Sequence, residues 1–317
     1  MPTIMIQVPL TESEFAQVRS ILPDWRVARP DDPEFGPALL AQAEVLVGWD
    51  PEAGTACLED GSVLRWIHEW SAGIDRLPLG RLRDRGVLLT TSSGVHAFPI
   101  SETVFAMVLS FTRGLDRFER QQVRGEWRRN GGIGEIHGST IGILGTGEIG
   151  AEVARLAKGF GMTTLGYRRK AEPAPGFDRT VGADGLLEML GECDVVVNAL
   201  PLTAHTRHLV GEAEFRAMKA SAFYVNIGRG GTNDEAALVR ALQEKRIAGA
   251  GLDVFETEPL PADSPLWRLD NAILTPHNAG MNPYYDRRAA GILLENLRDY
   301  AAGRTPSRNL VDLAEGY

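Results

Sequence analysis

The stretch TIGILGTGEIG, residues 140–150, decides the fold of this chain. Its first five residues predict a buried strand, and a run with helical spacing follows its last glycine. The pattern GxGxxG lies between them, where backbone N–H groups at a helix N-terminus can hold a pyrophosphate. Gly145 permits the tight turn, Gly147 lets the backbone approach phosphate, and Gly150 lets the helix pack closely on the strand. The stretch predicts a dinucleotide site at Gly145, Thr146, Gly147, Glu148, Ile149 and Gly150; the alternative is a glycine turn with only a structural role.

Strand and helix patterns alternate on both sides of this stretch. On its C-terminal side, strand-like apolar runs alternate with segments of helical spacing, which is typical of a parallel, doubly wound α/β sheet. Strands are expected at 163–167, 194–199, 222–227, 249–254 and 272–274, and helices at 149–160, 186–190, 212–218 and 234–244. On its N-terminal side, strands at 4–8 and 45–47, a helix at 12–22 and a strand-like pair at 66–67 predict a smaller α/β unit.

A long helix is expected to join the two parts. Apolar residues recur at helical spacing over 101–123, behind the capping-type start Ser101-Glu102, and a glycine-rich loop follows at 125–138. A last helix is expected over about 287–302. These patterns divide the chain into a domain of residues 1–99 with 286–317 and a domain of residues 100–285.

Composition excludes several classes of protein. The 317 residues have a net charge of −9, which disfavours a surface that binds the phosphates of nucleic acids. No apolar run is long enough to span a bilayer and the N-terminus lacks a signal-peptide pattern, so we expect no membrane contact and a cytoplasmic location. Cys57 and Cys193 form no Cys/His pattern, and His205 and His208 have no third ligand, so no metal site is expected.

The end of the second expected strand of the dinucleotide domain bears on which cofactor is used. An acidic residue at this place hydrogen-bonds the ribose 2′-hydroxyl of NAD. This chain has Arg168 and Arg169 there, and guanidinium groups can bind a 2′-phosphate in a bidentate manner. We therefore expect NADP(H) to be preferred, with NAD(H) as the alternative cofactor. The competing interpretation of the two arginines is a solvated basic turn.

Five further segments occur in the order of a known family. They are SAGID at 71–75, GVHAFPISE at 94–102, NIGRGG at 226–231, DVFETEP at 253–259 and TPHNAG at 275–280. Together with GTGEIG they resemble the D-isomer-specific 2-hydroxyacid dehydrogenase family. The resemblance implies a Rossmann-type domain, a smaller flavodoxin-like substrate domain and a cleft that closes on the ligand. It also implies a homodimer through the dinucleotide domain, with the 101–123 helix and the 125–138 loop at the interface.

The resemblance further implies which residues contact the ligands. Backbone N–H groups around Ala72, Gly73 and Ile74 are expected to bind the substrate carboxylate, with a glycine turn as the alternative. Further cofactor contacts are expected at Pro201, Ile227, Gly228, Arg229, Asp253, His277 and Gly280.

Three residues of these segments have the chemistry that reduction of a 2-keto acid needs. Arg229 can hold a carboxylate and polarise the neighbouring carbonyl. Histidine side chains change charge near neutral pH, so His277 can protonate the developing alkoxide, while Glu258 can orient its ring and favour the imidazolium. The alternatives are an arginine that neutralises a surface acid, a glutamate that caps a turn and a loop histidine. Substrate contacts are therefore expected from Arg229 and His277 together with the 72–74 backbone.

The leading hypothesis is an NADP(H)-dependent 2-hydroxyacid dehydrogenase that reduces small 2-keto acids of the glyoxylate and hydroxypyruvate type. One alternative is an NAD-dependent D-lactate or short phosphoglycerate dehydrogenase. Another is a corepressor-like protein that senses the dinucleotide without catalysis. Thr103, where many family members have histidine, and Met281-Asn282-Pro283 depart from the family pattern, and this leaves the choice of substrate open.

Overall fold

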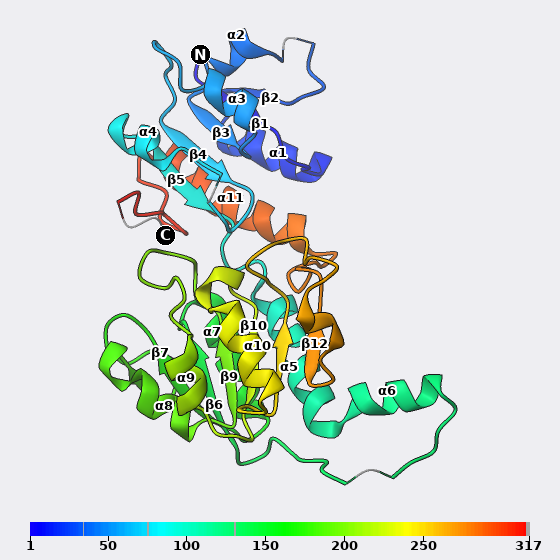
Figure 1. Ribbon diagram of the computed structural model, residues 1–317. Helices are drawn as coiled ribbons and strands as arrows, with labels where there is room; N and C mark the ends of the chain where they lie inside the picture. Colours follow the sequence, from blue (N-terminus) through cyan, green and yellow to red (C-terminus); the bar gives the residue numbers. More distant parts are fainter. Residues whose placement is uncertain (34, 75, 130, 315–317) are drawn as a thin grey trace. The chain divides into compact units, whose positions relative to one another are not determined.

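The computed structural model describes residues 1–33, 35–74, 76–129 and 131–314 and divides the chain into two compact units. Unit 1 consists of Met1–Val95 and Asn282–Tyr317, and unit 2 of His96–Met281 (Figure 1). Both boundaries lie four residues before the expected ones, 99 and 285. The first boundary follows from helix α5, Ala97–Arg113, which begins at Ala97 and belongs whole to unit 2.

Unit 1 is built on a parallel five-stranded sheet of order β2-β1-β3-β4-β5. The strands are β1 (Thr3–Ile6), β2 (Arg26–Ala28), β3 (Val45–Val47), β4 (Trp66–Glu69) and β5 (Leu88–Thr91). Helices α1 (Glu12–Ile21) and α11 (Tyr285–Ala301) pack on one face, where Ile4 and Trp66 share a core cluster with Val18 and Leu293. Helices α2 (Pro37–Leu40), α3 (Pro51–Ala56) and α4 (Leu79–Asp84) lie on the other face.

Unit 2 is built on a parallel seven-stranded sheet of order β12-β11-β10-β9-β6-β7-β8. The strands are β6 (Thr140–Leu144), β7 (Thr163–Tyr167), β8 (Arg179–Val181), β9 (Val195–Asn198), β10 (Phe223–Asn226), β11 (Gly249–Leu252) and β12 (Ala272–Leu274). Short 3₁₀ turns occur at Ala183–Gly185, Gly230–Thr232 and Pro265–Arg268. The predicted parallel, doubly wound sheet is therefore confirmed.

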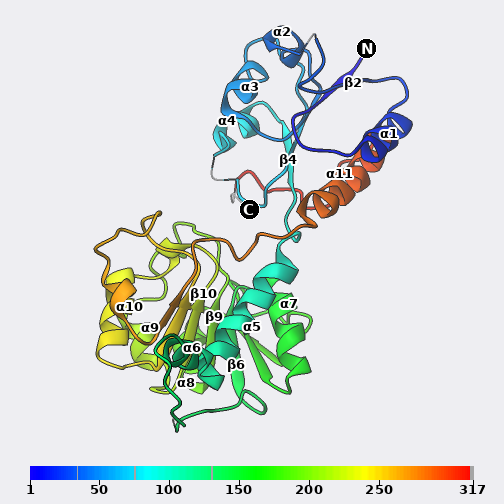
Figure 2. The ribbon, with the colours of Figure 1, turned by 90° about the vertical axis from the view of Figure 1, so that its right-hand side faces the viewer.

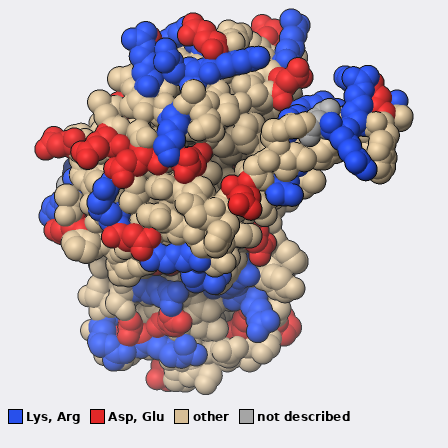
Figure 3. Space-filling view, turned by 90° about the horizontal axis from the view of Figure 1, so that it is seen from below, with Lys and Arg blue, Asp and Glu red and all other residues tan. Residues whose placement is uncertain are grey.

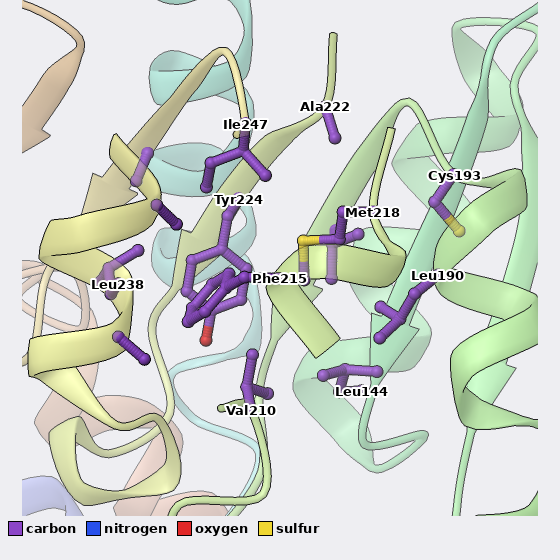
Figure 4. Packing of buried hydrophobic residues seen from close by; sticks show 14 of the residues in the cluster. Leu144, Leu190, Cys193, Val210, Phe215, Met218, Ala222, Tyr224, Leu238 and Ile247 are labelled. Atoms are coloured by element: carbon purple, nitrogen blue, oxygen red, sulfur yellow. The ribbon is translucent and has the colours of Figure 1, made fainter. Parts of the chain in front are cut away.

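Helices cover both faces of the unit 2 sheet (Figure 2). Helices α5 and α7 (Glu148–Gly159) pack on one face, and α8 (Leu186–Glu192), α9 (Glu212–Ala217) and α10 (Glu235–Gln243) on the other. On the face covered by α8, α9 and α10, the ring of Phe215 stands edge-on to Tyr224, with 5.4 Å between ring centroids (Figure 4). Leu144 and Leu190 belong to the same buried cluster. The strand that leads into GTGEIG is thus held on both sides by a packed core.

The prediction of one long helix over 101–123 is wrong in two respects. It is two helices, α5 and α6 (Leu115–Val123), separated at Gly114, whose φ of 68° is left-handed and ends α5. Its start at Ser101 is also wrong, because Ser101 lies buried within α5 and its hydroxyl donates to the Phe98 carbonyl at 2.8 Å. Among the described residues, no helix has both the length and the apolar character that crossing a membrane requires.

Candidate active site

The glycine loop after β6 has the geometry that a pyrophosphate needs. Gly145 has φ +101°, and its N–H donates to the Tyr167 carbonyl at 2.9 Å. A Cβ on Gly150 would lie 2.0 Å from the Gly145 carbonyl oxygen, so helix α7 could not pack this closely with any larger residue. A Cβ on Gly147, in contrast, would meet no described atom within 4 Å. Gly147 is the N-cap of α7, and among the described residues no side chain makes the capping hydrogen bond there, so the loop fits an approaching phosphate.

The two candidate cofactor-reading arginines follow β7 directly beside this loop. A Cβ on Gly166 would lie 2.8 Å from the Thr146 methyl group, which shows how closely the end of β7 and the loop pack. Arg168 is half-buried and its backbone N–H donates to the Val181 carbonyl, whereas Arg169 is exposed. The structure thus brings both arginines to the carboxyl edge of the sheet, next to the helix N-terminus.

His277 and Glu258, nineteen residues apart, form a hydrogen-bonded pair. His277 Nδ1 lies 2.6 Å from Glu258 Oε2, and both side chains are partly exposed. The other carboxylate oxygen of Glu258 accepts the backbone N–H of Phe255 at 3.0 Å, which fixes the carboxylate. A carboxylate that accepts the Nδ1 proton holds the ring in one orientation and leaves Nε2 to exchange a proton.

Arg229 lies between two glycines that let its segment pack against neighbouring backbone. A Cβ on Gly228 would lie 2.5 Å from the Leu200 carbonyl oxygen, and one on Gly230 would lie 1.9 Å from backbone atoms of Phe255. The Arg229 guanidinium donates from Nη1 to the Gly228 carbonyl at 2.9 Å. Arg229, Glu258 and His277 line one pocket of about 450 Å³, together with Arg207, His208 and Glu256. Arg229, Glu258 and His277, the three candidate catalytic residues of the sequence analysis, therefore lie together within unit 2.

Asp253 fixes the segment that bears His277. Its buried carboxylate accepts the Thr275 hydroxyl at 2.6 Å and the backbone N–H groups of Asn278 and Ala279 at 3.0 and 3.2 Å. These bonds tie residues 275–279 to the end of β11. Sequence analysis missed this loop-fixing position, and the expected cofactor contact of Asp253 stays a prediction.

A family model and several known proteins match the chain. The model for the NAD-binding domain of D-isomer specific 2-hydroxyacid dehydrogenases matches residues 105–279. A glyoxylate reductase of Korarchaeum cryptofilum is 38% identical over 259 residues, which cover 78% of this chain and 76% of the relative. A glyoxylate/hydroxypyruvate reductase B of Citrobacter koseri is 37% identical over 281 residues, 87% of each chain.

Among solved structures, an NADPH-dependent glyoxylate/hydroxypyruvate reductase of Sinorhizobium meliloti in complex with NADP and sulfate is similar over the whole of both chains. Its TM-score is 0.82 and its sequence identity 27%. The family match covers more than half of the chain and lies within unit 2.

The chain belongs to the D-isomer specific 2-hydroxyacid dehydrogenase family. It is an NAD(P)-dependent oxidoreductase of 2-hydroxy acids, and its Rossmann-type unit binds a nicotinamide dinucleotide.

In this 2-hydroxyacid dehydrogenase, His96 is a site-adjacent residue that sequence analysis missed. Its Nδ1 lies 3.0 Å from the Gly280 carbonyl, and a Cβ on Gly280 would come within 2.8 Å of that nitrogen. Burial lowers the pKa of His96; the Gly280 hydrogen bond opposes this shift, and the charge of Arg229 adds to it. A single histidine before a helix forms no sequence pattern from which its contact with the Gly280 carbonyl could be predicted.

The remaining expected cofactor residues occupy two kinds of position in unit 2. Ile227 is buried, and its backbone N–H donates to the Asn198 carbonyl at 3.1 Å. Pro201 is exposed, and its carbonyl accepts the Thr206 hydroxyl at 2.6 Å. Their cofactor contacts stay predictions.

The segment expected to bind the substrate carboxylate follows β4 in unit 1. Ser71 closes a turn by donating its hydroxyl to the Gly73 carbonyl at 2.7 Å, and its backbone N–H donates to Glu69 at 3.1 Å. Ala72 is exposed, and Gly73 and Ile74 are half-buried, so backbone of this turn is accessible. Asp75, the next residue, lies outside the described residues.

The histidines at 205 and 208 do not come together around a metal. His208 Nε2 lies 2.9 Å from Glu256 Oε1, and the backbone N–H of His205 donates to the Thr203 hydroxyl. Among the described residues, no group of three or more His, Cys, Asp or Glu side chains has the arrangement of a metal site.

Proposed function

We propose that the chain is an NADP(H)-dependent reductase of small 2-keto acids of the glyoxylate and hydroxypyruvate type. The observation that supports this most strongly is the His277–Glu258 pair, 2.6 Å apart, in one pocket with Arg229. The names of the two reductases that match this chain, from Korarchaeum cryptofilum and Citrobacter koseri, point to the same substrate class. A cytoplasmic location stays a prediction.

The proposed mechanism assigns one task to each side chain. Arg229 binds the substrate carboxylate and polarises the carbonyl oxygen, since a guanidinium can donate two parallel hydrogen bonds. His277 donates the proton from Nε2 to the developing alkoxide, and takes one back from the hydroxyl in the oxidative direction. Glu258 orients the ring through Nδ1 and stabilises its protonated form. A nicotinamide cofactor, when bound, would supply the hydride to the carbonyl carbon. The residues at Gly145, Gly147 and Gly150 fit that cofactor's pyrophosphate.

Turnover is the first experiment. Purified protein is mixed with NADPH and either glyoxylate or hydroxypyruvate, and loss of absorbance at the nicotinamide band is followed over many turnovers. Sustained turnover supports the reductase. Cofactor binding without turnover on any 2-keto acid would contradict it and favour a dinucleotide sensor.

NADPH preference is the finer part of the proposal. Arg168 and Arg169 lie beside the Gly145 loop, where a 2′-phosphate would meet two guanidinium groups. We expect kcat/KM to be at least about tenfold higher with NADPH than with NADH, and the double variant Arg168→Ala/Arg169→Ala to erase most of that ratio. Arg155→Ala removes an exposed arginine of α7 that pairs with Glu152 and serves as the matched control. Preference for NADH in the wild-type chain would overturn this part alone.

A homodimer through unit 2 is also proposed. Helix α6 has no buried residue and projects from the sheet, and the segment after it exposes Trp127 to 91% (Figure 1). Figure 3 shows Lys and Arg side chains gathered on this projection. Arg124, at the end of α6, and Arg128 are both exposed. An exposed tryptophan beside an unpacked helix is typical of an interface. Sedimentation of the wild-type chain tests this, and a stable monomer at micromolar concentration would reject it.

A further inference from the structure

A second histidine–glutamate pair lines the pocket that contains His277 and Glu258. His208 Nε2 lies 2.9 Å from Glu256 Oε1, and the two side chains are 48% and 35% exposed. The His277–Glu258 pair has almost the same exposure, 48% and 34%. Both histidines also have a left-handed φ of 51°. The proposed mechanism uses only one of these two pairs, so the other needs an explanation of its own.

The backbone of His208 holds the loop that bears Arg229. Its N–H donates to the Gly231 carbonyl at 2.9 Å, and the Val210 N–H donates to the Thr232 carbonyl at 3.1 Å. The side chain of Val210 is fully buried in the core cluster of this face (Figure 4). The loop between β9 and α9 is therefore anchored in the core, and from there it holds the chain two residues after Arg229.

The ring of His208 holds the loop that bears Glu258. Its partner Glu256 accepts the backbone N–H of Glu235, the first residue of α10, at 3.1 Å. The Glu256 N–H in turn donates to the Glu235 carboxylate at 3.0 Å. The preceding N–H, that of Phe255, donates to Glu258 at 3.0 Å. The peptide that His208 fixes through Glu256 is thus the neighbour of the one that fixes Glu258.

The His208 ring also offsets an unfavourable arrangement of charge. Burial raises the pKa of Glu235; the backbone N–H of Glu256 opposes this shift, and the charge of Glu256 adds to it. A ring N–H that donates to Glu256 lowers the electrostatic cost of holding two carboxylates together. Without that donor, the loop is less firmly held against α10. The other charged or titratable side chains that line this pocket are those of Arg207, Arg229, Glu258 and His277.

We propose that His208 is a positioning residue of the active site, which holds the Arg229 loop through its backbone N–H and the Glu258 loop through its ring. The inference rests on the proposed 2-keto acid reductase. The two loops touch directly, since a Cβ on Gly230 would lie 1.9 Å from backbone atoms of Phe255. His208 acts through Glu256 rather than on the substrate, and loss of its ring loosens the contact between Glu258 and the catalytic histidine.

A matched pair of substitutions separates the hydrogen bond from the backbone. His208→Gln and His208→Met place unbranched side chains of similar length at the same left-handed φ, so both have the same backbone strain. The glutamine amide can donate to Glu256, whereas methionine cannot. Glu256→Ala removes the contact from the other side and replaces His208→Met if that variant does not fold. His205→Met removes an exposed ring from the same loop and serves as the control.

Kinetics measure whether the ring acts through Glu258. We expect His208→Met to lower kcat/KM for glyoxylate about tenfold and to move the alkaline limb of the pH–rate profile to lower pH, as Glu258→Gln does. His208→Gln and His205→Met should both stay within about threefold of the wild-type chain. Added to Glu258→Gln, His208→Met should lower kcat/KM less than about twofold further, because both substitutions weaken one contact.

Hydrogen exchange tests the same contact without substrate. The N–H groups of Phe255 and Glu256 both donate to carboxylates of this cluster. We expect them to exchange at least about threefold faster in His208→Met than in the wild-type chain, and at nearly the wild-type rate in His208→Gln. Amides of α7, on the other face of the sheet, should exchange alike in all variants and report on global stability.

Several results would overturn the positioning role and leave the reductase intact. They are an unmoved pH–rate profile in His208→Met, unchanged exchange at residues 255 and 256, and fully additive losses in the double variant. Equal losses in His208→Gln and His208→Met would do the same, because the donated hydrogen bond would then be irrelevant. If the wild-type chain reduces no 2-keto acid, the proposed function fails and the positioning role falls with it.

Discussion

The two parallel sheets each have a histidine near their carboxyl edge, and the two histidines have opposite surroundings. His277 of unit 2 is 48% exposed and pairs with Glu258. His68 of unit 1 is fully buried, with Nδ1 2.8 Å from the Thr90 hydroxyl and Nε2 3.3 Å from that of Ser92. Burial lowers the pKa of His68 to about 3. The first ring can exchange protons with a ligand, whereas the second is held neutral by its surroundings.

The position of each histidine relative to its strand causes this difference. His68 lies inside β4, where both neighbours are strand residues and both ring nitrogens find hydroxyl partners on the adjacent strand or just beyond it. His277 follows β12 with a left-handed φ of 51°, on a segment that Asp253 ties down. Loops after parallel strands are where ligands bind in such sheets. A histidine therefore becomes a candidate acid or base through its place in the fold and through its partner.

The largest expected effect comes from removing the exposed ring. His277→Ala should lower kcat for 2-keto acid reduction by about 10²–10⁴, because the developing alkoxide loses its proton donor. His68→Gln, in contrast, should change kcat less than about threefold, since Gln can still hydrogen-bond two hydroxyls. Steady-state kinetics with both variants, each checked for NADPH binding, measures the contrast. Near-wild-type turnover in His277→Ala would remove this residue from the mechanism.

Next in size is a pair of glycine variants that separates packing from ligand contact. A Cβ on Gly150 would lie 2.0 Å from the Gly145 carbonyl, so Gly150→Ala should lower the free energy of unfolding by about 1–3 kcal/mol. Gly147 has an ordinary φ of −74° and open space around it, so Gly147→Ala should fold normally and bind NADPH more weakly. Denaturant unfolding and cofactor titration of both variants test this. Unchanged NADPH affinity in Gly147→Ala would argue against phosphate contact there.

Unit 2 was more predictable from sequence than unit 1, for physical reasons. Strands β6, β7 and β12 have the predicted bounds, because each is an apolar run that leads into a glycine or polar loop with its own signature. Strands β2 and β5 of unit 1 were not predicted, and neither was β8 of unit 2. β2 is a three-residue strand, and β5 reads LLTT, which has no alternation of apolar and polar residues.

Contacts that depend on tertiary geometry were the least predictable part of the site. Helical periodicity runs through Gly114, and only its left-handed φ shows that α5 ends there. Glu258 and His277 were paired by resemblance, but their 2.6 Å contact depends on how two loops fold. The loop-fixing bonds of Asp253 and the His96 contact with Gly280 involve single polar residues, which form no pattern in one sequence.

A smaller catalytic effect is expected from the partner of His277. Glu258→Gln keeps an oxygen that can accept from the ring but removes the negative charge that favours the imidazolium. We expect kcat/KM to fall about tenfold to hundredfold and the alkaline limb of the pH–rate profile for reduction to move to lower pH, because the proton-donating ring then loses its proton at lower pH. A loss of activity with an unmoved pH profile would indicate that Glu258 only packs.

The smallest effect concerns the acid stability contributed by His68. Its folded pKa of about 3 lies below the ordinary value of 6.5, so between these values the unfolded chain binds a proton that the folded chain does not. Stability therefore falls as pH drops through this window, by at most about 1.4 kcal/mol per pH unit for this single group. His68→Gln removes the titrating ring, and we expect it to lose about 2 kcal/mol less than the wild-type chain between pH 7 and pH 5. Urea unfolding at both pH values measures the difference. His277→Gln provides the matched histidine on the exposed side, so equal acid sensitivity in His68→Gln and His277→Gln would contradict the contrast between the two edges.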